Sequence, residues 1–232
     1  MAGKPVSIKT PDGSMAAYHA TPASGKGPGI VVIQEIFGVN PGIRSICDTL
    51  AGQGFSAMAP DLFWRIEPGV VLNPDKPEEF QRALSLMGKF DQAKGIADIQ
   101  TTITTLRKDK SCTGKVGDVG YCLGGLLAFL AAARTDADAS VGYYGVNIDQ
   151  KLDEAKKIKK PLMLHIAEAD GFVTPEAQKK IKDGLKGNKL VTIHSYPGAD
   201  HGFARVGGAH SDKKNADLAN GRTLAFFKQY LA

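Results

Sequence analysis

The chain has 232 residues, of which 43% are hydrophobic and 23% are charged, so it can bury a sizeable core. Lys and Arg total 29 and Asp and Glu total 24, and the resulting net charge of +5 is scattered along the chain, which argues against a nucleic-acid partner. No linker or internal repeat divides the sequence, so we expect a single domain over residues 1–232.

The chain begins with two strand patterns, residues 6–10 and 15–20. The turn signal Pro-Asp-Gly-Ser at 11–14 joins them and predicts an antiparallel hairpin. A continuous β-branched run at 30–33 is typical of a buried parallel strand. Asn40 and Pro41 then provide an N-cap and a first helical residue, as at the start of a helix.

The rest of the chain alternates strand and helix patterns, as doubly wound sheets do. We expect further strands at 55–59, 115–121, 140–144, 161–168 and 190–196, and helices around 96–106, over 123–133 and ending near 231. The predicted fold is α/β, with a mostly parallel central sheet, an N-terminal antiparallel hairpin and helices on both faces. The irregular, Pro-rich segment 62–77 is long for a connection and is a candidate for shaping a binding site.

The segment 115–125, KVGDVGYCLGG, is the most informative part of the sequence. It joins an apolar strand to G-x-C-x-G-G and then to a helical run, which is the pattern of a nucleophile elbow with Cys122 in place of serine. Gly120 and Gly124 are expected because a side chain there would collide with neighbouring backbone. The start of the helix would favour the thiolate of Cys122, whereas a merely buried thiol would not need this glycine spacing.

The other two cysteines, Cys47 and Cys112, carry no such context, and Cys47 lies on an apolar helical face. The three cysteines show no metal or disulfide spacing, which favours a reducing compartment. Because the N-terminus lacks a signal-peptide pattern and no apolar stretch could span a bilayer, we expect a cytoplasmic protein without a membrane partner.

A nucleophilic thiol needs a base within hydrogen-bond reach. Of the five histidines, His201 alone lies in a loop just past a predicted strand end. His19, His165 and His194 fall inside predicted strands, and His210 lies in a Gly-rich loop with no evident partner. We therefore expect His201 to be the base.

The third member of a triad is a carboxylate that orients the base. Asp170 leads into a turn after the strand at 161–168, and we favour it over Glu168, which is nearer the strand and could be structural. The order nucleophile, acid, histidine matches the α/β-hydrolase fold. The oxyanion hole is expected from the backbone N–H groups of Leu123 and Ile36.

Five segments carry a family resemblance: 34–40 (QEIFGVN), 59–62 (APDL), 117–125 (GDVGYCLGG), 139–146 (ASVGYYGV) and 201–205 (HGFAR). In these segments the chain resembles the dienelactone hydrolases (carboxymethylenebutenolidases) of the α/β-hydrolase superfamily. The resemblance implies that Cys122, Asp170 and His201 form the triad, and that Glu35 helps to deprotonate the cysteine when substrate displaces it. From the residues alone, Glu35 would pair with Arg44 or Arg205.

The family reaction opens dienelactone to maleylacetate through an acyl enzyme, and two arginines hold the substrate carboxylate. Arg205 matches one of them, and a guanidinium suits a carboxylate through paired hydrogen bonds. The position of the other falls on Phe80. Arg82 is close in sequence, but two residues along a helix rotate a side chain by roughly 200°. Arg82 would therefore face away from the position of Phe80 unless the helix is shifted.

By the same comparison, Leu84 and Met87 stand where the family carries aromatic residues, whereas Tyr143 is retained. The predicted substrate pocket is therefore more apolar than is usual for the family. We expect hydrolysis of a carboxylic ester or lactone, either dienelactone or a less charged relative. No metal or organic cofactor is implied, and we expect a monomer.

Three other classes of function compete with hydrolysis. A dinucleotide-binding domain would need G-x-G-x-x-G, with a small residue where Cys122 stands. The alternative that remains is a redox-sensing or non-catalytic thiol protein on the same fold, in which Cys122 reacts with oxidants and the histidine tunes its acidity. An interaction module has little support, because no exposed aromatic stripe or charge block is evident.

Overall fold

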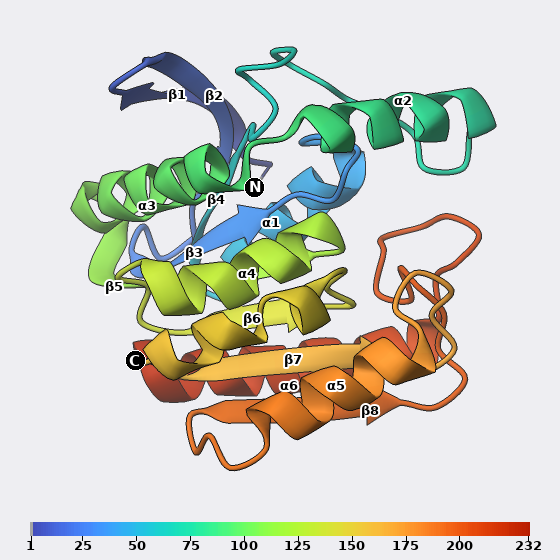
Figure 1. The fold of residues 1–232 in the computed structure, drawn as a ribbon. Coiled ribbons are helices and arrows are strands. Elements are labelled where there is room, and N and C mark those ends of the chain that lie inside the picture. The colour runs from blue at the N-terminus through green and yellow to red at the C-terminus, as the bar shows by residue number, and fades with distance from the viewer. Residues whose placement is uncertain (1) are drawn as a thin grey trace.

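An eight-stranded sheet forms the centre of the molecule in the computed structural model, which describes residues 2–232 (Figure 1). The strand order is β1-β2-β4-β3-β5-β6-β7-β8. β2 pairs antiparallel with β1 and with β4, and the remaining pairs are parallel. The strands are β1 (Lys4–Thr10), β2 (Gly13–Ala20), β3 (Gly27–Ile33), β4 (Ser56–Pro60), β5 (Cys112–Tyr121), β6 (Ser140–Tyr143), β7 (Leu162–Ala167) and β8 (Val191–Tyr196).

Helices cover both faces of this sheet. In Figure 1, α3, α4 and α5 lie in front of the strands and α1 and α6 lie behind them, while α2 projects beyond the sheet. The helices are α1 (Pro41–Gly52), α2 (Pro77–Lys89), α3 (Gln92–Lys108), α4 (Leu123–Arg134), α5 (Pro175–Leu185) and α6 (Lys213–Leu231), with 3-10 turns at Ile148–Gln150 and Leu152–Lys157. The predicted α/β-hydrolase architecture is confirmed.

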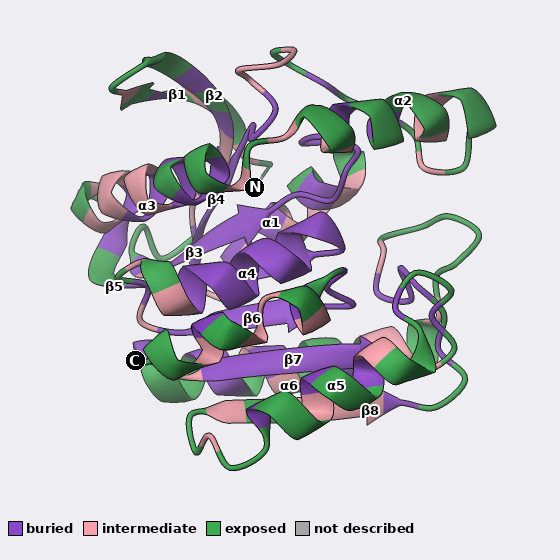
Figure 2. Ribbon diagram, in the orientation of Figure 1, coloured by how far each residue is buried: buried purple, intermediate pink, exposed green. Residues whose placement is uncertain are grey.

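β3 and α4, which lie on either side of the predicted elbow, are almost completely buried (Figure 2). Residues 30–33 are fully buried, and α4 is buried from its first residue to Ala132 because it packs against β5 and β6, against α3 and against the 3-10 turn at Leu152–Lys157. The first ten residues of α4, LGGLLAFLAA, are apolar on all sides of the helix. Such a helix must be buried on all sides. The elbow is therefore held between two rigid, buried elements.

Local signals located most element ends correctly. The Asn40 side chain accepts a hydrogen bond from the N–H of Ile43 at 3.1 Å, so the predicted N-cap of α1 is confirmed. β3 and β5 each begin three residues earlier than predicted, at Gly27 and Cys112. Residues 61–76 form neither a helix nor a regular strand, as expected. Within residues 2–232, every helix is too short or too polar to cross a lipid bilayer.

Candidate active site

Cys122 occupies the sharp turn between β5 and α4. Its φ of 56° is in the left-handed region, which a non-glycine residue enters only at a cost. A Cβ on Gly120 would lie 1.9 Å from the carbonyl oxygen of Gly124, and one on Gly124 would lie 2.5 Å from that of Ile33. The two glycines therefore permit the turn that places the Cys122 thiol at the first turn of α4.

His201 and Asp170 come from the loops that follow β8 and β7. The His201 Nδ1 lies 2.8 Å from the Asp170 Oδ2, and both side chains are almost completely buried. The other carboxylate oxygen of Asp170 accepts the N–H groups of Phe172 at 2.8 Å and Val173 at 3.2 Å. A carboxylate held in this way fixes the proton of His201 on Nδ1 and leaves Nε2 for another partner.

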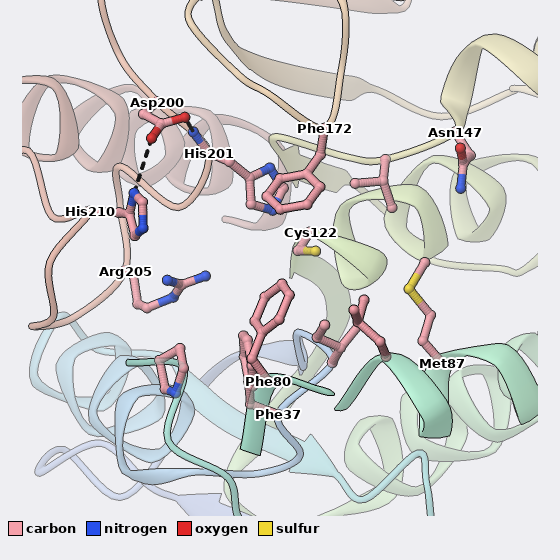
Figure 3. Close-up of a pocket in the computed structure, with 14 residues that line it drawn as sticks. Phe37, Phe80, Met87, Cys122, Asn147, Phe172, Asp200, His201, Arg205 and His210 are labelled. Carbon is pink, nitrogen blue, oxygen red and sulfur yellow. Dashed lines mark hydrogen bonds and ion pairs between the residues drawn. The ribbon is translucent and has the colours of Figure 1, made fainter. Parts of the chain in front are cut away.

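The charges around His201 strongly favour its protonated form. Burial lowers the pKa of His201, but the negative charge of the Cys122 thiolate and the hydrogen bond to Asp170 outweigh burial and raise this pKa to about 10. Figure 3 shows Cys122 directly beside His201 at the same cavity. The arrangement can therefore hold an imidazolium next to a thiolate.

Glu35 forms a buried, two-pronged ion pair with Arg205. The Nε and an Nη of Arg205 each donate a hydrogen bond of 3.0 Å to one oxygen of Glu35. Of the two partners considered from the sequence, Arg205 is therefore the one observed. Arg44 instead donates to the carbonyl of Val39 at 2.9 Å. Because each charge of a buried pair neutralises the other, losing either partner would be costly.

Cys122, His201 and Arg205 line a cavity of about 420 Å³, a suitable size for a small ligand (Figure 3). Its wall is mainly apolar, with Arg205, His210 and Asp200 at one side and Asn147 at the opposite side. The lining residues are Ile36, Phe37, Pro74, Phe80, Leu84, Met87, Cys122, Val146, Asn147, Phe172, Asp200, His201, Arg205 and His210.

Three aromatic rings form one side of the cavity. The ring of Phe80 lies 6.0 Å from that of Phe37 and 6.4 Å from that of Phe172, measured between ring centroids. Phe172 also packs edge-on against His201 at 4.9 Å. Sequence reasoning missed Phe37 and Phe172, although both follow predicted site residues closely along the chain. Phe80 makes this wall apolar at the position where the family carries an arginine.

Two of the expected substrate-binding residues, Arg82 and Tyr143, do not line this cavity. Arg82 forms an ion pair with Glu67 and is half exposed, because its place on α2 directs it away from Phe80. Tyr143 is fully buried in β6, and its hydroxyl bonds to Thr223 at 2.6 Å. Leu84 and Met87 do line the cavity.

His210, for which the sequence showed no partner, has one in Asp200. The His210 Nδ1 lies 3.0 Å from the Asp200 Oδ2, and the Oδ1 of Asp200 accepts the N–H of His201 at 2.7 Å. Both residues line the cavity. The contact joins positions ten residues apart in an irregular loop, where no periodic pattern indicates proximity.

The two N–H groups expected at the oxyanion hole are available. Within residues 2–232, neither the N–H of Leu123 nor that of Ile36 donates to a protein acceptor. Leu123 is the first residue of α4, where N–H groups lack intrahelical partners, and Ile36 lines the cavity. Over the same part of the chain, no cluster of three or more His, Cys, Asp or Glu side chains could hold a metal ion.

Comparisons with known proteins agree with this geometry. The model of the dienelactone hydrolase family matches residues 15–231. A protein of Azospirillum brasilense is 51% identical over 222 residues, covering 95% of each chain. Carboxymethylenebutenolidase 1 of Cupriavidus pinatubonensis is 40% identical over 212 residues, covering 91% of this chain and 90% of its own.

The solved structures that resemble the chain have the same fold. A crystal structure described as a dienelactone hydrolase, from Klebsiella pneumoniae, has 29% identity and a TM-score of 0.86, with 98% of each chain covered. The Pyrococcus furiosus esterase Pf2001 has 16% identity, covers 99% of this chain and 93% of its own, and has a TM-score of 0.72. The second likeness is one of fold alone.

Proposed function

The chain belongs to the dienelactone hydrolase family and is therefore a carboxylic ester or lactone hydrolase, and we propose that Cys122 is its nucleophile. The observation that carries the proposal is the meeting of three features at one cavity. These are a thiol on a strained turn at a helix start, an imidazole beside it, and a carboxylate bonded to the far nitrogen of that imidazole.

The proposed reaction begins with attack of the Cys122 sulfur on the carbonyl carbon. His201 carries the thiol proton on Nε2 while Asp170 keeps the other ring proton on Nδ1. The tetrahedral oxyanion would accept hydrogen bonds from the free N–H groups of Leu123 and Ile36. Its collapse breaks the C–O bond, forms a thioester, and transfers the proton from His201 to the leaving alkoxide.

Water completes the cycle. His201 removes a proton from a water molecule, and the hydroxide formed attacks the thioester carbonyl. The second tetrahedral intermediate expels the Cys122 thiolate and releases the carboxylic acid. The imidazolium and thiolate are thereby restored, which agrees with the raised pKa of His201 beside Cys122.

We further propose that Glu35 and Arg205 couple substrate binding to thiolate formation. Arg205 is the guanidinium at the cavity wall that could bind an anionic or strongly polar group on a substrate. A substrate that draws Arg205 away would release the Glu35 carboxylate, which would then accept the proton of the Cys122 thiol and pass it to His201, so that the imidazolium and thiolate form when substrate is bound. The resemblance to the family suggests this role, and the observed ion pair supports it.

The aromatic wall supports a substrate less charged than dienelactone. Only one arginine faces the cavity among its lining residues, and Phe80 replaces the second by an apolar surface. An ester or lactone with a neutral, apolar acyl group would bury that group against Phe80, Leu84 and Met87. A carboxylate in the same place would lose hydration without gaining a partner.

The test compares kcat/KM on dienelactone and on a neutral aryl ester of similar reactivity, for the wild type and Cys122→Ala. We expect the variant to lose at least about 10³-fold on both substrates, and the wild type to prefer the neutral ester. Cys112→Ala, which removes a buried thiol outside the cavity, is the control. Wild-type turnover in Cys122→Ala would refute Cys122 as the nucleophile, whereas absence of ester and lactone hydrolysis in the wild type would favour the redox-sensing alternative.

A further inference from the structure

Tyr144 has a hydroxyl that is buried without a partner beside the proposed site. The residue is 2% exposed, and its oxygen makes no hydrogen bond with any of the residues that the structure describes. A buried polar group left unpaired costs free energy. Replacing the tyrosine by phenylalanine would remove this cost, so the hydroxyl does not serve the folded state as it stands.

The backbone of Tyr144 carries a second cost. Its φ is 37°, in the left-handed region that tyrosine rarely adopts. The N–H of Tyr144 donates to the carbonyl of His165 at 2.8 Å, which anchors this conformation. The ring is held between His201, edge-on at 5.0 Å, and Phe203 at 5.5 Å. The strain and the packing fix the direction in which the hydroxyl points.

The charged residues near this hydroxyl are those of the proposed site. Burial raises the pKa of Tyr144 well above its usual value, the charge of Glu35 raises it further, and Arg205 opposes that rise. Cys122 acts on it in the same direction as Glu35. Tyr144 therefore remains a neutral phenol that can donate one hydrogen bond, and Glu35 exerts the largest charge effect on it.

Two other buried tyrosines in the same region, Tyr143 and Tyr196, have hydroxyls that are hydrogen-bonded. The Tyr143 hydroxyl bonds to Thr223 and Asn220, and the Tyr196 hydroxyl bonds to His165 at 2.7 Å and to Arg222 at 3.2 Å. Among residues 2–232, the Tyr144 hydroxyl is the fully enclosed tyrosine hydroxyl that lacks a partner, and the charges of Glu35 and Arg205 both act on it. In the observed state both oxygens of Glu35 accept hydrogen bonds from Arg205.

We propose that Tyr144 is a positioning residue whose hydroxyl donates a hydrogen bond to the Glu35 carboxylate once Glu35 separates from Arg205. The inference rests on the proposed function, in which a substrate draws Arg205 away. Without Tyr144 the released carboxylate would be a buried charge with no partner. With it, Glu35 keeps one hydrogen bond and a defined orientation toward Cys122.

The first test is Tyr144→Phe. Because only an unpaired hydroxyl is lost, we expect an unchanged or higher midpoint of denaturant unfolding, together with a kcat lowered about 3- to 10-fold and little change in KM. Tyr196→Phe is the control, since it removes a bonded hydroxyl outside the cavity and should lower the midpoint without changing kcat. Full kcat in Tyr144→Phe, or a lowered unfolding midpoint, would overturn the inference.

The second test needs no substrate and so remains informative if Cys122 proves not to be the nucleophile. Arg205→Met separates Glu35 from its partner permanently, and Tyr144→Phe is then compared in this background and in the wild type. We expect the loss of the hydroxyl to lower the unfolding midpoint only in the Arg205→Met background. The same effect in both backgrounds would contradict a contact between the Tyr144 hydroxyl and Glu35. If Arg205→Met does not fold, the kcat of Tyr144→Phe decides.

Discussion

The Asp170 carboxylate can face His201 in only one way. One of its oxygens lies 2.8 Å from the Nδ1 of His201, and the other accepts two backbone N–H groups from the turn that follows. Both oxygens therefore act as acceptors, and neither position would tolerate a donor. The orientation of the imidazole depends on this pair of constraints.

Asp170→Asn should lower kcat by roughly 10² to 10⁴-fold. The amide oxygen must face the two backbone N–H groups, so the NH₂ group would point at the Nδ1 of His201. That nitrogen would then have to accept a hydrogen bond, and the proton would move to Nε2, where it blocks uptake of the thiol proton. Steady-state kinetics on the neutral aryl ester would measure the loss.

Glu168→Gln is the matched control for that variant. Glu168 is the other carboxylate considered from the sequence, and it pairs with Lys182 at 3.2 Å on the protein surface. We expect wild-type kcat in Glu168→Gln. Equal losses in the two variants would contradict the assignment of Asp170.

The second prediction concerns the titration of His201. We expect its imidazole to titrate at about pH 10 in the wild type, and at a lower pH in Cys122→Ala, because the thiolate charge that opposes burial is lost. The ring proton signals of His201 in NMR spectra over a pH series would report both values. An unchanged titration in Cys122→Ala would show that the thiol does not act on the ring.

The same shift has a defined effect on stability. The folded-state pKa of His201 lies above the ordinary value of 6.5, so its protonation favours the folded state. This contribution is fully present below about pH 6.5 and is lost as the pH rises toward 10. Denaturant unfolding over that range should show a smaller loss for Cys122→Ala than for the wild type.

The features predictable from the sequence are those that depend on local chain geometry. The elbow around Cys122 and the helix start at Asn40 depend on residue types at fixed spacings, and both are observed. The pairing of Asp170 with His201 was also predictable, because loops at the carboxyl ends of parallel strands meet at one edge of the sheet.

The parts of the site that were missed depend on contacts between irregular segments. Phe172 and His210 reach the cavity from loops whose path no periodicity describes. The wrong placement of Tyr143 has a related origin. Tyr143 ends β6 and is fully buried, whereas the next residue, Tyr144, leaves the strand with a φ of 37° and packs against His201. Resemblance to a family therefore predicts which residue lies near the site, but it does not predict whether the side chain of that residue points into the cavity.

Phe80→Arg should shift the substrate preference toward anions. The side chain at this position lines the cavity, so a guanidinium there would stand on the same wall as the substrate and could pair with a carboxylate. We expect the ratio of kcat/KM on dienelactone to kcat/KM on the neutral ester to rise about 10-fold. Phe80→Leu removes the aromatic contacts without adding charge and should leave the ratio unchanged. A rise with leucine as well would assign the effect to space and not to charge.

Gly124→Ala should damage both stability and activity. The new methyl group would lie 2.5 Å from the carbonyl oxygen of Ile33 and 2.6 Å from that of Gln34, so β3 and α4 would have to move apart. We expect a loss of about 2–4 kcal/mol in the free energy of unfolding, and a fall in kcat because Cys122 moves relative to Ile36.

Gly221→Ala in α6 is the control. Its methyl group meets open space, and replacing glycine within a helix should stabilise the protein by about 0.5–1 kcal/mol. If the two variants unfolded at the same denaturant concentration, the close contact between the elbow and β3 would not be what requires glycine at position 124.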